Sequence, residues 1–140
     1  MTTPGTSDYA LPLPRMRGLT AEWYGWLQRH ELRFQCCDGC ARWRHVPREV
    51  CPGCGSTDWS WRASTGRGRI YSWTTIHRSL HPDFQDTPYA AVVVETVEGP
   101  RVMTSIVDRE PDELVIDLPV EVVFDDVTPE VTLARFRSAG

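Results

Sequence analysis

Residues 37–55 read CDGCARWRHVPREVCPGCG, and this stretch decides the fold. It contains two Cys-x2-Cys pairs, Cys37 with Cys40 and Cys51 with Cys54, separated by ten residues. Each pair presents two thiolates to one ion, and two pairs complete a tetrahedron with Zn–S bonds of about 2.3 Å. Four protein thiolates leave no open position for water or substrate. The spacing therefore predicts a closed zinc site that stabilises the fold and performs no chemistry.

Other interpretations of the cysteines stay open at this point. An iron site of the rubredoxin type uses the same four ligands. A redox dithiol usually occurs once, near a βαβ pattern that this sequence lacks. Cys36 could replace Cys37 as a ligand, but its separation from Cys40 would break the two-residue spacing of the other pair. We therefore expect Cys36 to be a spare thiol.

Upstream of the cysteines, residues 1–19 contain three prolines and few core-forming residues, which predicts a flexible arm. A helix is expected from Thr20, which can cap its first turn. The helix carries an apolar stripe made by Trp23, Trp26 and Leu27. Such a stripe is typical of core packing, and a docking face for a partner protein is the alternative. A short strand at residues 32–35 leads into the cysteines, and a second at residues 43–46 pairs back.

Downstream of the cysteines, the sequence reads as short strands separated by turn signals. The strands are predicted at residues 69–78, 89–97, 101–107, 120–125 and 131–136. Residues 98–100, Glu-Gly-Pro, predict a tight hairpin turn, and residues 111–117 predict one helical turn. Five strands with a short connection before the fourth favour a small barrel of the OB type, with an SH3-like barrel as the alternative.

The predicted protein is thus mostly β, with an N-terminal helix, a rubredoxin-like zinc ribbon and a five-stranded OB-fold barrel. Its expected parts are a flexible arm at residues 1–19, the helix and lead-in strand at 20–35, the zinc ribbon at 36–62 and the barrel at 63–140.

Charge is distributed unevenly along the 140 residues, whose net charge is −4. Residues 29–78 hold nine arginines and four acidic residues, a local net charge of +5, whereas residues 79–140 have a net charge of −9. An acidic barrel disfavours nucleic-acid binding, because the barrel face would have to follow a phosphate backbone. No apolar run approaches the roughly 18 residues of a membrane span, and no signal peptide is evident. We therefore expect a cytoplasmic protein without a membrane partner.

With the cysteine pairs and the barrel in place, the sequence resembles the acyl-CoA-associated zinc-ribbon/OB-fold proteins, long catalogued as a domain of unknown function. The resemblance covers residues 23–137. It is carried by LRFQ (32–35), Pro47, CPGCGS (51–56), GRG (66–68), IYS (70–72), HR (77–78), PY (88–89), GPR (99–101), PVEV (119–122) and TLARF (132–136). Only the cysteine pairs are specific by themselves. The order and spacing together identify the resemblance.

The resemblance implies a non-catalytic accessory subunit, with structural zinc as its cofactor. Its implied partner is a thiolase-fold enzyme, namely a thiolase or an aldolase such as those of steroid side-chain degradation, or an enoyl-CoA hydratase. The partner would supply the catalytic groups and this chain would help it to handle an acyl-CoA. The alternative function is a zinc-ribbon/OB protein that binds single-stranded nucleic acid. A self-sufficient enzyme is a third hypothesis, but no spacing of nucleophile and base supports it.

Candidate binding residues follow from the chemistry of CoA, which offers phosphates to arginine and an adenine to aromatic rings. The arginines of the basic segment could contact phosphates: Arg42, Arg44, Arg48, Arg62, Arg67, Arg69 and Arg78. A weaker hypothesis places His77 and Arg78, with the loop at residues 80–88, at the mouth where CoA or the partner's active site lies. The metal ligands are predicted to be Cys37, Cys40, Cys51 and Cys54, and no catalytic residue is assigned.

Overall fold

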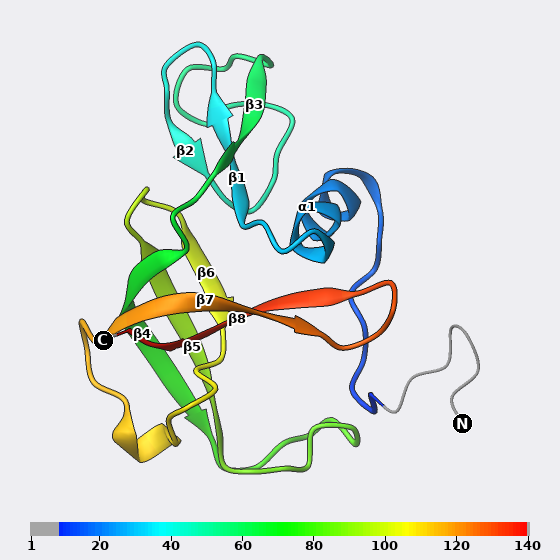
Figure 1. The fold of residues 1–140 in the computed structure, drawn as a ribbon, viewed down its shortest axis with the longest axis vertical. Coiled ribbons are helices and arrows are strands. Elements are labelled where there is room, and N and C mark those ends of the chain that lie inside the picture. Colours follow the sequence, from blue (N-terminus) through cyan, green and yellow to red (C-terminus); the bar gives the residue numbers. More distant parts are fainter. Residues whose placement is uncertain (1–8, 140) are drawn as a thin grey trace.

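The computed structural model describes residues 9–139, which form one α-helix, a short 3-10 helix and two antiparallel sheets (Figure 1). The smaller sheet has the order β2-β1-β3 and consists of β1 (Arg33–Cys37), β2 (Trp43–Arg44) and β3 (Trp59–Ala63). The larger sheet has the order β6-β5-β4-β7-β8 and consists of β4 (Arg67–Ile76), β5 (Tyr89–Thr96), β6 (Arg101–Thr104), β7 (Pro119–Asp126) and β8 (Thr132–Ser138). This confirms the predicted fold class, a zinc-ribbon region followed by a curled five-stranded sheet of the OB type.

Helix α1 (Gly18–Gln28) lies beside the ribbon sheet and above the larger sheet (Figure 1). The prediction that Thr20 caps this helix is wrong, because the N-cap is Arg17 and no side chain caps the first turn. The helix therefore starts two residues before Thr20, and the N–H of Ala21 donates to the carbonyl of Arg17 (3.1 Å). The described residues, 9–139, contain no helix long and apolar enough to cross a membrane.

The C-terminal end of α1 is attached to the larger sheet through His30. This residue has a φ of 58°, a left-handed conformation more usual for glycine, and its N–H donates to the carbonyl of Leu27 (2.8 Å). Its imidazole stacks on Phe124 of β7 with ring centroids 5.1 Å apart. Its Nε2 lies 2.9 Å from Oδ1 of Asp126. A side chain thus fixes the helix end against the sheet.

The larger sheet curls around β4, the strand that pairs with both β5 and β7. Glycine is required at position 68, where β4 lies against the end of β5, because a Cβ there would lie 2.5 Å from the carbonyl oxygen of Glu95. At the open side, the segment after β6 meets β8 through a parallel bridge between Ile106 and Phe136. The sheet is therefore a half-barrel whose two edge strands, β6 and β8, are joined only over a short distance.

One apolar core links the helix, the ribbon and the half-barrel. Its buried members come from all three parts: Trp23, Leu27, Leu32, Phe34, Ile70, Val92, Val94, Val102, Ile106, Leu114, Val120 and Phe136. The connection from β3 to β4 is held by Glu98 of the β5–β6 turn, whose carboxylate accepts hydrogen bonds from Ser64 and from the N–H of Thr65 (3.0 Å). The ribbon is consequently packed against the half-barrel and also hydrogen-bonded to it.

Most predicted elements are present with shifted ends. The hairpin turn at residues 98–100 joins β5 to β6, and the helical turn is the short 3-10 helix η1 (Pro111–Glu113). The strand predicted at residues 101–107 ends at Thr104, and that predicted at 69–78 ends at Ile76. Strand β3 was not predicted, because its sequence WSWRA contains no run of aliphatic residues. Part of the predicted arm, residues 1–8, lies outside the described residues.

Candidate metal centre and binding pocket

The four predicted cysteine ligands come together at one end of the ribbon. Their sulfur atoms all lie within 4.8 Å of one another, with Sγ–Sγ distances of 3.6 Å between Cys37 and Cys54 and 3.7 Å between Cys40 and Cys51. A tetrahedral site with metal–sulfur bonds of about 2.3 Å requires sulfur atoms about 3.8 Å apart. Cys37 and Cys51 are buried, whereas Cys40 and Cys54 are exposed. The four residues are therefore positioned to bind one metal ion and fit a tetrathiolate site.

Backbone N–H groups of the second Cys-x2-Cys turn point at its sulfur atoms. The N–H of Gly53 donates to Sγ of Cys51 (3.4 Å). The N–H groups of Cys54 and Gly53 lower the pKa of Cys51 to about 6, because they stabilise its thiolate. The N–H of Ser56 acts in the same direction on Cys54, but the three other sulfur atoms raise the pKa of Cys54 to about 11. Four such thiolates repel one another unless a cation lies among them.

Cys36 is kept away from the other sulfur atoms by the geometry of β1. Successive side chains of a strand point to opposite faces, so Cys36 and Cys37 lie on different faces of the ribbon sheet. The thiol of Cys36 is buried and donates to the carbonyl of Ala41 (3.5 Å). The metal-binding cluster among the described residues contains the other four cysteines and leaves Cys36 out.

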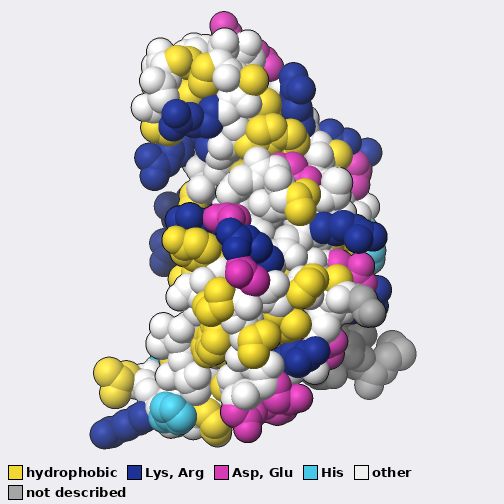
Figure 2. Space-filling view, turned by 90° about the vertical axis from the view of Figure 1, so that its left-hand side faces the viewer, with side chains coloured by type: hydrophobic (Ala, Val, Ile, Leu, Met, Phe, Trp, Pro, Cys, Tyr) yellow, Lys and Arg dark blue, Asp and Glu magenta, His cyan; other side chains and the backbone are white. Residues whose placement is uncertain are grey.

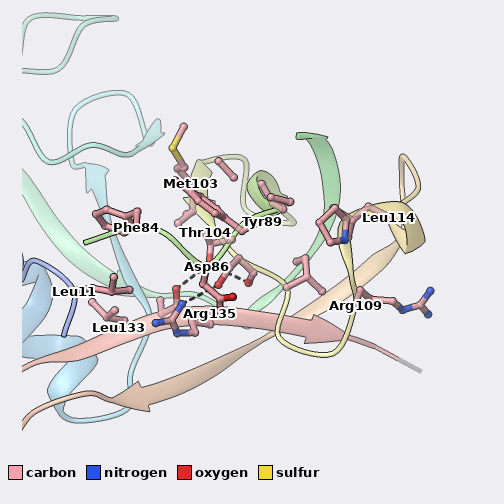
Figure 3. A pocket seen from close by; sticks show the side chains of 18 of the residues that line it. Leu11, Phe84, Asp86, Tyr89, Met103, Thr104, Arg109, Leu114, Leu133 and Arg135 are labelled. Carbon is pink, nitrogen blue, oxygen red and sulfur yellow. Dashed lines mark hydrogen bonds between the residues drawn. The ribbon is translucent and has the colours of Figure 1, made fainter. Parts of the chain in front are cut away.

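A pocket of about 690 Å³ opens along the seam between β6 and β8 (Figure 3). Apolar side chains make most of its lining, including Trp23, Tyr24, Phe84, Tyr89, Ile106 and Leu133. In Figure 3, Leu11 and Leu133 lie at one end of the pocket, and Leu114 and Arg109 lie at the other. A cavity of this size and character is typical of sites for small organic ligands.

The charged groups of the pocket are mostly acidic or already paired. Asp83, Asp86 and Glu110 contribute carboxylates to its lining. Arg135 donates to Asp125 (2.7 Å) and to the hydroxyl of Ser105 (3.0 Å), so its charge is balanced within the sheet. The pocket therefore favours an uncharged apolar group over a phosphate.

His77 and Arg78 follow the end of β4 and are both exposed. Neither lines the pocket, although the loop after them contributes Asp83, Phe84 and other residues to it. The structure thus separates this pair from the cavity that their loop helps to form. Sequence reasoning did not find the pocket, because its residues come from six separate segments and no local motif marks them.

The arginines predicted to bind phosphate do not lie together on one surface. Arg44 is buried, with a relative exposure of 6%. Arg69 is paired with Glu95 (2.8 Å) and with Asp117. In Figure 2, basic side chains flank the ribbon at the top of the view, and a group of acidic side chains lies at the bottom, over the half-barrel. Of the predicted set, Arg42, Arg48 and Arg62 are exposed on the ribbon, whereas Arg67 and Arg78 are exposed at the two ends of β4.

Comparison with known proteins gives matches over both parts of the chain. Residues 27–60 match the family model described as "ChsH2, rubredoxin-like zinc ribbon domain", and residues 61–125 match "ChsH2, C-terminal OB-fold domain". A protein of Methanothermobacter thermautotrophicus named "DUF35 domain-containing scaffold protein" is 35% identical over 74% of this chain and 78% of its own length. The chain belongs to the DUF35 family.

Other DUF35-related proteins extend the comparison. A Thermomonospora curvata protein named "Probable enoyl-CoA hydratase alpha subunit" is 37% identical over 91% of this chain, which spans only 40% of that protein. A structure named "Ltp2-ChsH2(DUF35) aldolase" matches with a TM-score of 0.82 and 36% identity, covering 91% of this chain and all of the matched chain. A DUF35 structure from Sulfolobus solfataricus has a TM-score of 0.62 at 10% identity and shows the shared fold.

Proposed function

We propose that this DUF35 chain is an accessory subunit that assembles with an enzyme acting on acyl-CoA, an aldolase of the thiolase fold or an enoyl-CoA hydratase. The observation that carries the proposal is the match to the whole DUF35 chain of a structure named as an aldolase. The relative named as a hydratase subunit supports the second kind of partner. In either assembly, the partner supplies the catalytic groups and this chain supplies a binding surface.

The metal centre has a structural role in this proposal. Cys37, Cys40, Cys51 and Cys54 hold one zinc ion, which supplies binding energy that folds the ribbon. The spacing of the four sulfur atoms and the family of the ribbon support zinc in this position. Because four thiolates complete the coordination, the chain's own residues at this site stabilise the ribbon and do not contact substrate.

The pocket between β6 and β8 receives the acyl end of the acyl-CoA. Its aromatic and aliphatic lining suits an apolar chain, and its carboxylates disfavour the phosphates at the other end of the molecule. His77 and Arg78, exposed beside the pocket's loop, contact the CoA or the partner. Leu80 of the same loop is 90% exposed, which fits a residue that a partner covers.

Co-expression with a thiolase-fold or enoyl-CoA hydratase enzyme from the same organism tests the assembly. We expect gel filtration to give a single complex whose activity on acyl-CoA exceeds that of the partner alone. Substitution of both His77 and Arg78 by alanine should weaken the complex or its affinity for CoA. A monomeric chain next to a partner that is fully active by itself would contradict the subunit role. Salt-sensitive binding to single-stranded DNA, without affinity for CoA, would support a nucleic-acid function instead.

Calorimetric titration with CoA and with acyl-CoAs of increasing chain length tests the pocket. We expect affinity to rise with acyl length and Ala134→Phe, which fills the cavity, to remove that rise. Ala63→Phe, at an exposed position of β3, is the matched control and should bind as the unsubstituted protein does. Equal affinity for CoA and for long acyl-CoAs would contradict an acyl-binding role.

A further inference from the structure

Arg44 of β2 is a buried cation without a carboxylate partner. Its Nε donates to Oε1 of Gln35 (2.9 Å), and its Nη2 donates to the carbonyl of Arg48 (2.8 Å). Its Nη1 is buried and has no hydrogen-bond partner. No ion pair of Arg44 with an acidic residue is found among residues 9–139. A buried charge with only neutral partners is strongly destabilising unless an opposite charge lies nearby.

The opposite charge lies on the same face of the ribbon sheet. Gln35 and Cys37 are two residues apart on β1, so their side chains share a face. Arg44 is the cross-strand partner of Gln35, and Trp59 is the cross-strand partner of Cys37. The guanidinium of Arg44 lies 6.0 Å from the ring centroid of Trp59, which confirms that both point to this face. Arg44 therefore occupies the face from which Cys37 enters the metal centre.

A second arginine, Arg42, follows the first Cys-x2-Cys pair and packs against the second Cys-x2-Cys turn at Gly53. The guanidinium of Arg42 lies against Gly53, where a Cβ would be only 2.9 Å from Cζ and Nε of the arginine. The N–H of the same glycine donates to Sγ of Cys51. Arg42 also has no ion pair with an acidic residue within the described part of the chain. The absence of a side chain at Gly53 thus allows a cation to approach the sulfur atoms.

We propose that Arg44 and Arg42 balance the charge of the metal–thiolate centre and thereby set its affinity for the metal and the charge state that it prefers. Four thiolates around a divalent ion carry a net charge of −2, which two guanidinium groups offset. Both are positioning residues that act through the electrostatic field at the sulfur atoms and ligate nothing. The inference rests on the proposed tetrathiolate site and goes beyond its structural role.

Zinc affinity, measured in the full chain by competition with a chromogenic chelator, tests the charge balance. Loss of groups around metal ligands typically lowers affinity 10- to 100-fold, so we expect a loss of about that size for Arg44→Met and about tenfold for Arg42→Gln, whose charge is screened by solvent. Arg44→Lys and Arg42→Lys keep the charge and should recover most of the affinity. Arg62→Gln is the matched control, because Arg62 pairs with Phe34 and lies on the opposite face of the same sheet.

The reduction potential of the iron-substituted protein separates charge from packing. A tetrathiolate centre carries −1 with Fe³⁺ and −2 with Fe²⁺, so a nearby cation favours the reduced form. Arg42→Gln should lower the potential, whereas Arg42→Lys and Arg62→Gln should leave it unchanged. Each tenfold loss in preference for the reduced centre corresponds to about 59 mV for this one-electron couple. Because Arg42 is exposed, its substitution tests the proposal even where Arg44→Met does not fold.

The possible failures are distinct from one another. A protein that binds neither zinc nor iron would overturn the proposed metal site itself. Normal metal binding in the unsubstituted protein, with Arg42→Gln and Arg44→Met both within twofold of it in zinc affinity, would overturn the charge balance alone. Equal losses for the lysine and the uncharged variants at both positions would show a packing role and would also overturn it.

Discussion

The ribbon and the half-barrel are stabilised by different forces. The half-barrel buries aliphatic and aromatic side chains from every strand, such as Ile70, Val94 and Phe136. On the metal-binding face, the ribbon buries Gln35, Arg44 and two thiols instead. The stability of a hydrophobic core comes from the removal of apolar surface from water, so it needs no bound ligand. The stability of a metal-binding module depends on the metal ion that it binds. One chain thus contains a module whose folding depends on bound metal, the ribbon, and a module whose folding does not, the half-barrel.

Removal of the metal should give the largest difference in stability between the ribbon and the half-barrel. Structural zinc sites contribute apparent free energies on the order of 10–16 kcal/mol, so we expect a strong chelator to unfold the ribbon. Hydrogen exchange measured by mass spectrometry should then show loss of protection in β1–β3 and retained protection in β4 and β5. Cys51→Ser should give the same pattern without a chelator, and Cys36→Ser should not. A ribbon that keeps its protection without metal would contradict this assignment of forces.

The reverse experiment removes apolar volume from the half-barrel. Phe136 is fully buried, and Phe136→Ala should lower the free energy of unfolding by about 3–5 kcal/mol. Because the cavity lies far from the ribbon's metal-binding face, zinc affinity of the folded protein should stay unchanged. Urea denaturation and chelator competition measure the two quantities on one preparation. The neighbouring Arg137→Ala, which removes an exposed ion pair with Glu121 (2.8 Å), should lower stability by less than about 1 kcal/mol.

The ribbon and the half-barrel also differ in how much of their structure could be predicted from the sequence. The metal cluster could be predicted from spacing alone, since the ligands are local and Cys-x2-Cys turns have one geometry. The half-barrel strands could be predicted from alternation and turns, but their ends shifted where tertiary pairing decided them. Sequence reasoning missed β3, whose pairing depends on β1, and the pocket, whose residues meet only after the sheet curls. It also misjudged Arg44, because nothing in the sequence distinguishes a buried arginine from an exposed one.

Acidification should weaken the contact between the ribbon and helix α1 through His45. Its ring lies between Trp23 (4.8 Å between centroids) and Phe34 (5.5 Å), and burial lowers its pKa from 6.5 to about 4. The unfolded chain therefore binds a proton at higher pH than the folded chain does, so stability is complete above pH 6.5 and falls toward pH 4. Between pH 7.5 and pH 5 the expected loss is about 2 kcal/mol.

Replacement of His45 by phenylalanine isolates that loss. The variant keeps an aromatic ring in the contact and has no proton to bind, so its stability should change less over the same pH range. Denaturation of both proteins at matched pH with zinc in excess gives the difference directly. Parallel pH profiles for the two proteins would show that His45 does not carry the dependence.

The smallest expected effect concerns the link between α1 and the half-barrel. The hydroxyl of Thr132 and then the imidazole of His30 lower the pKa of Asp126 below its ordinary 3.8. Since the folded pKa is the lower one, the carboxylate stabilises the protein above pH 3.8, and that contribution is lost as pH falls through the folded value. Asp126→Asn should therefore melt below the unsubstituted protein at neutral pH, with the gap closing in acid.

Because this link is exposed, its effect should also be screened by salt. Asp112→Asn is the matched control, since Asp112 is exposed on η1 and forms no ion pair within residues 9–139. Melting curves of the half-barrel at several pH values, with and without added salt, measure the gap for both variants. If Asp126→Asn and Asp112→Asn gave the same profile, the His30–Asp126 contact would add nothing measurable, and α1 would be held on the half-barrel by apolar packing and by the hydrogen bond from Nε2 of Gln28 to the carbonyl of Pro129 (3.2 Å).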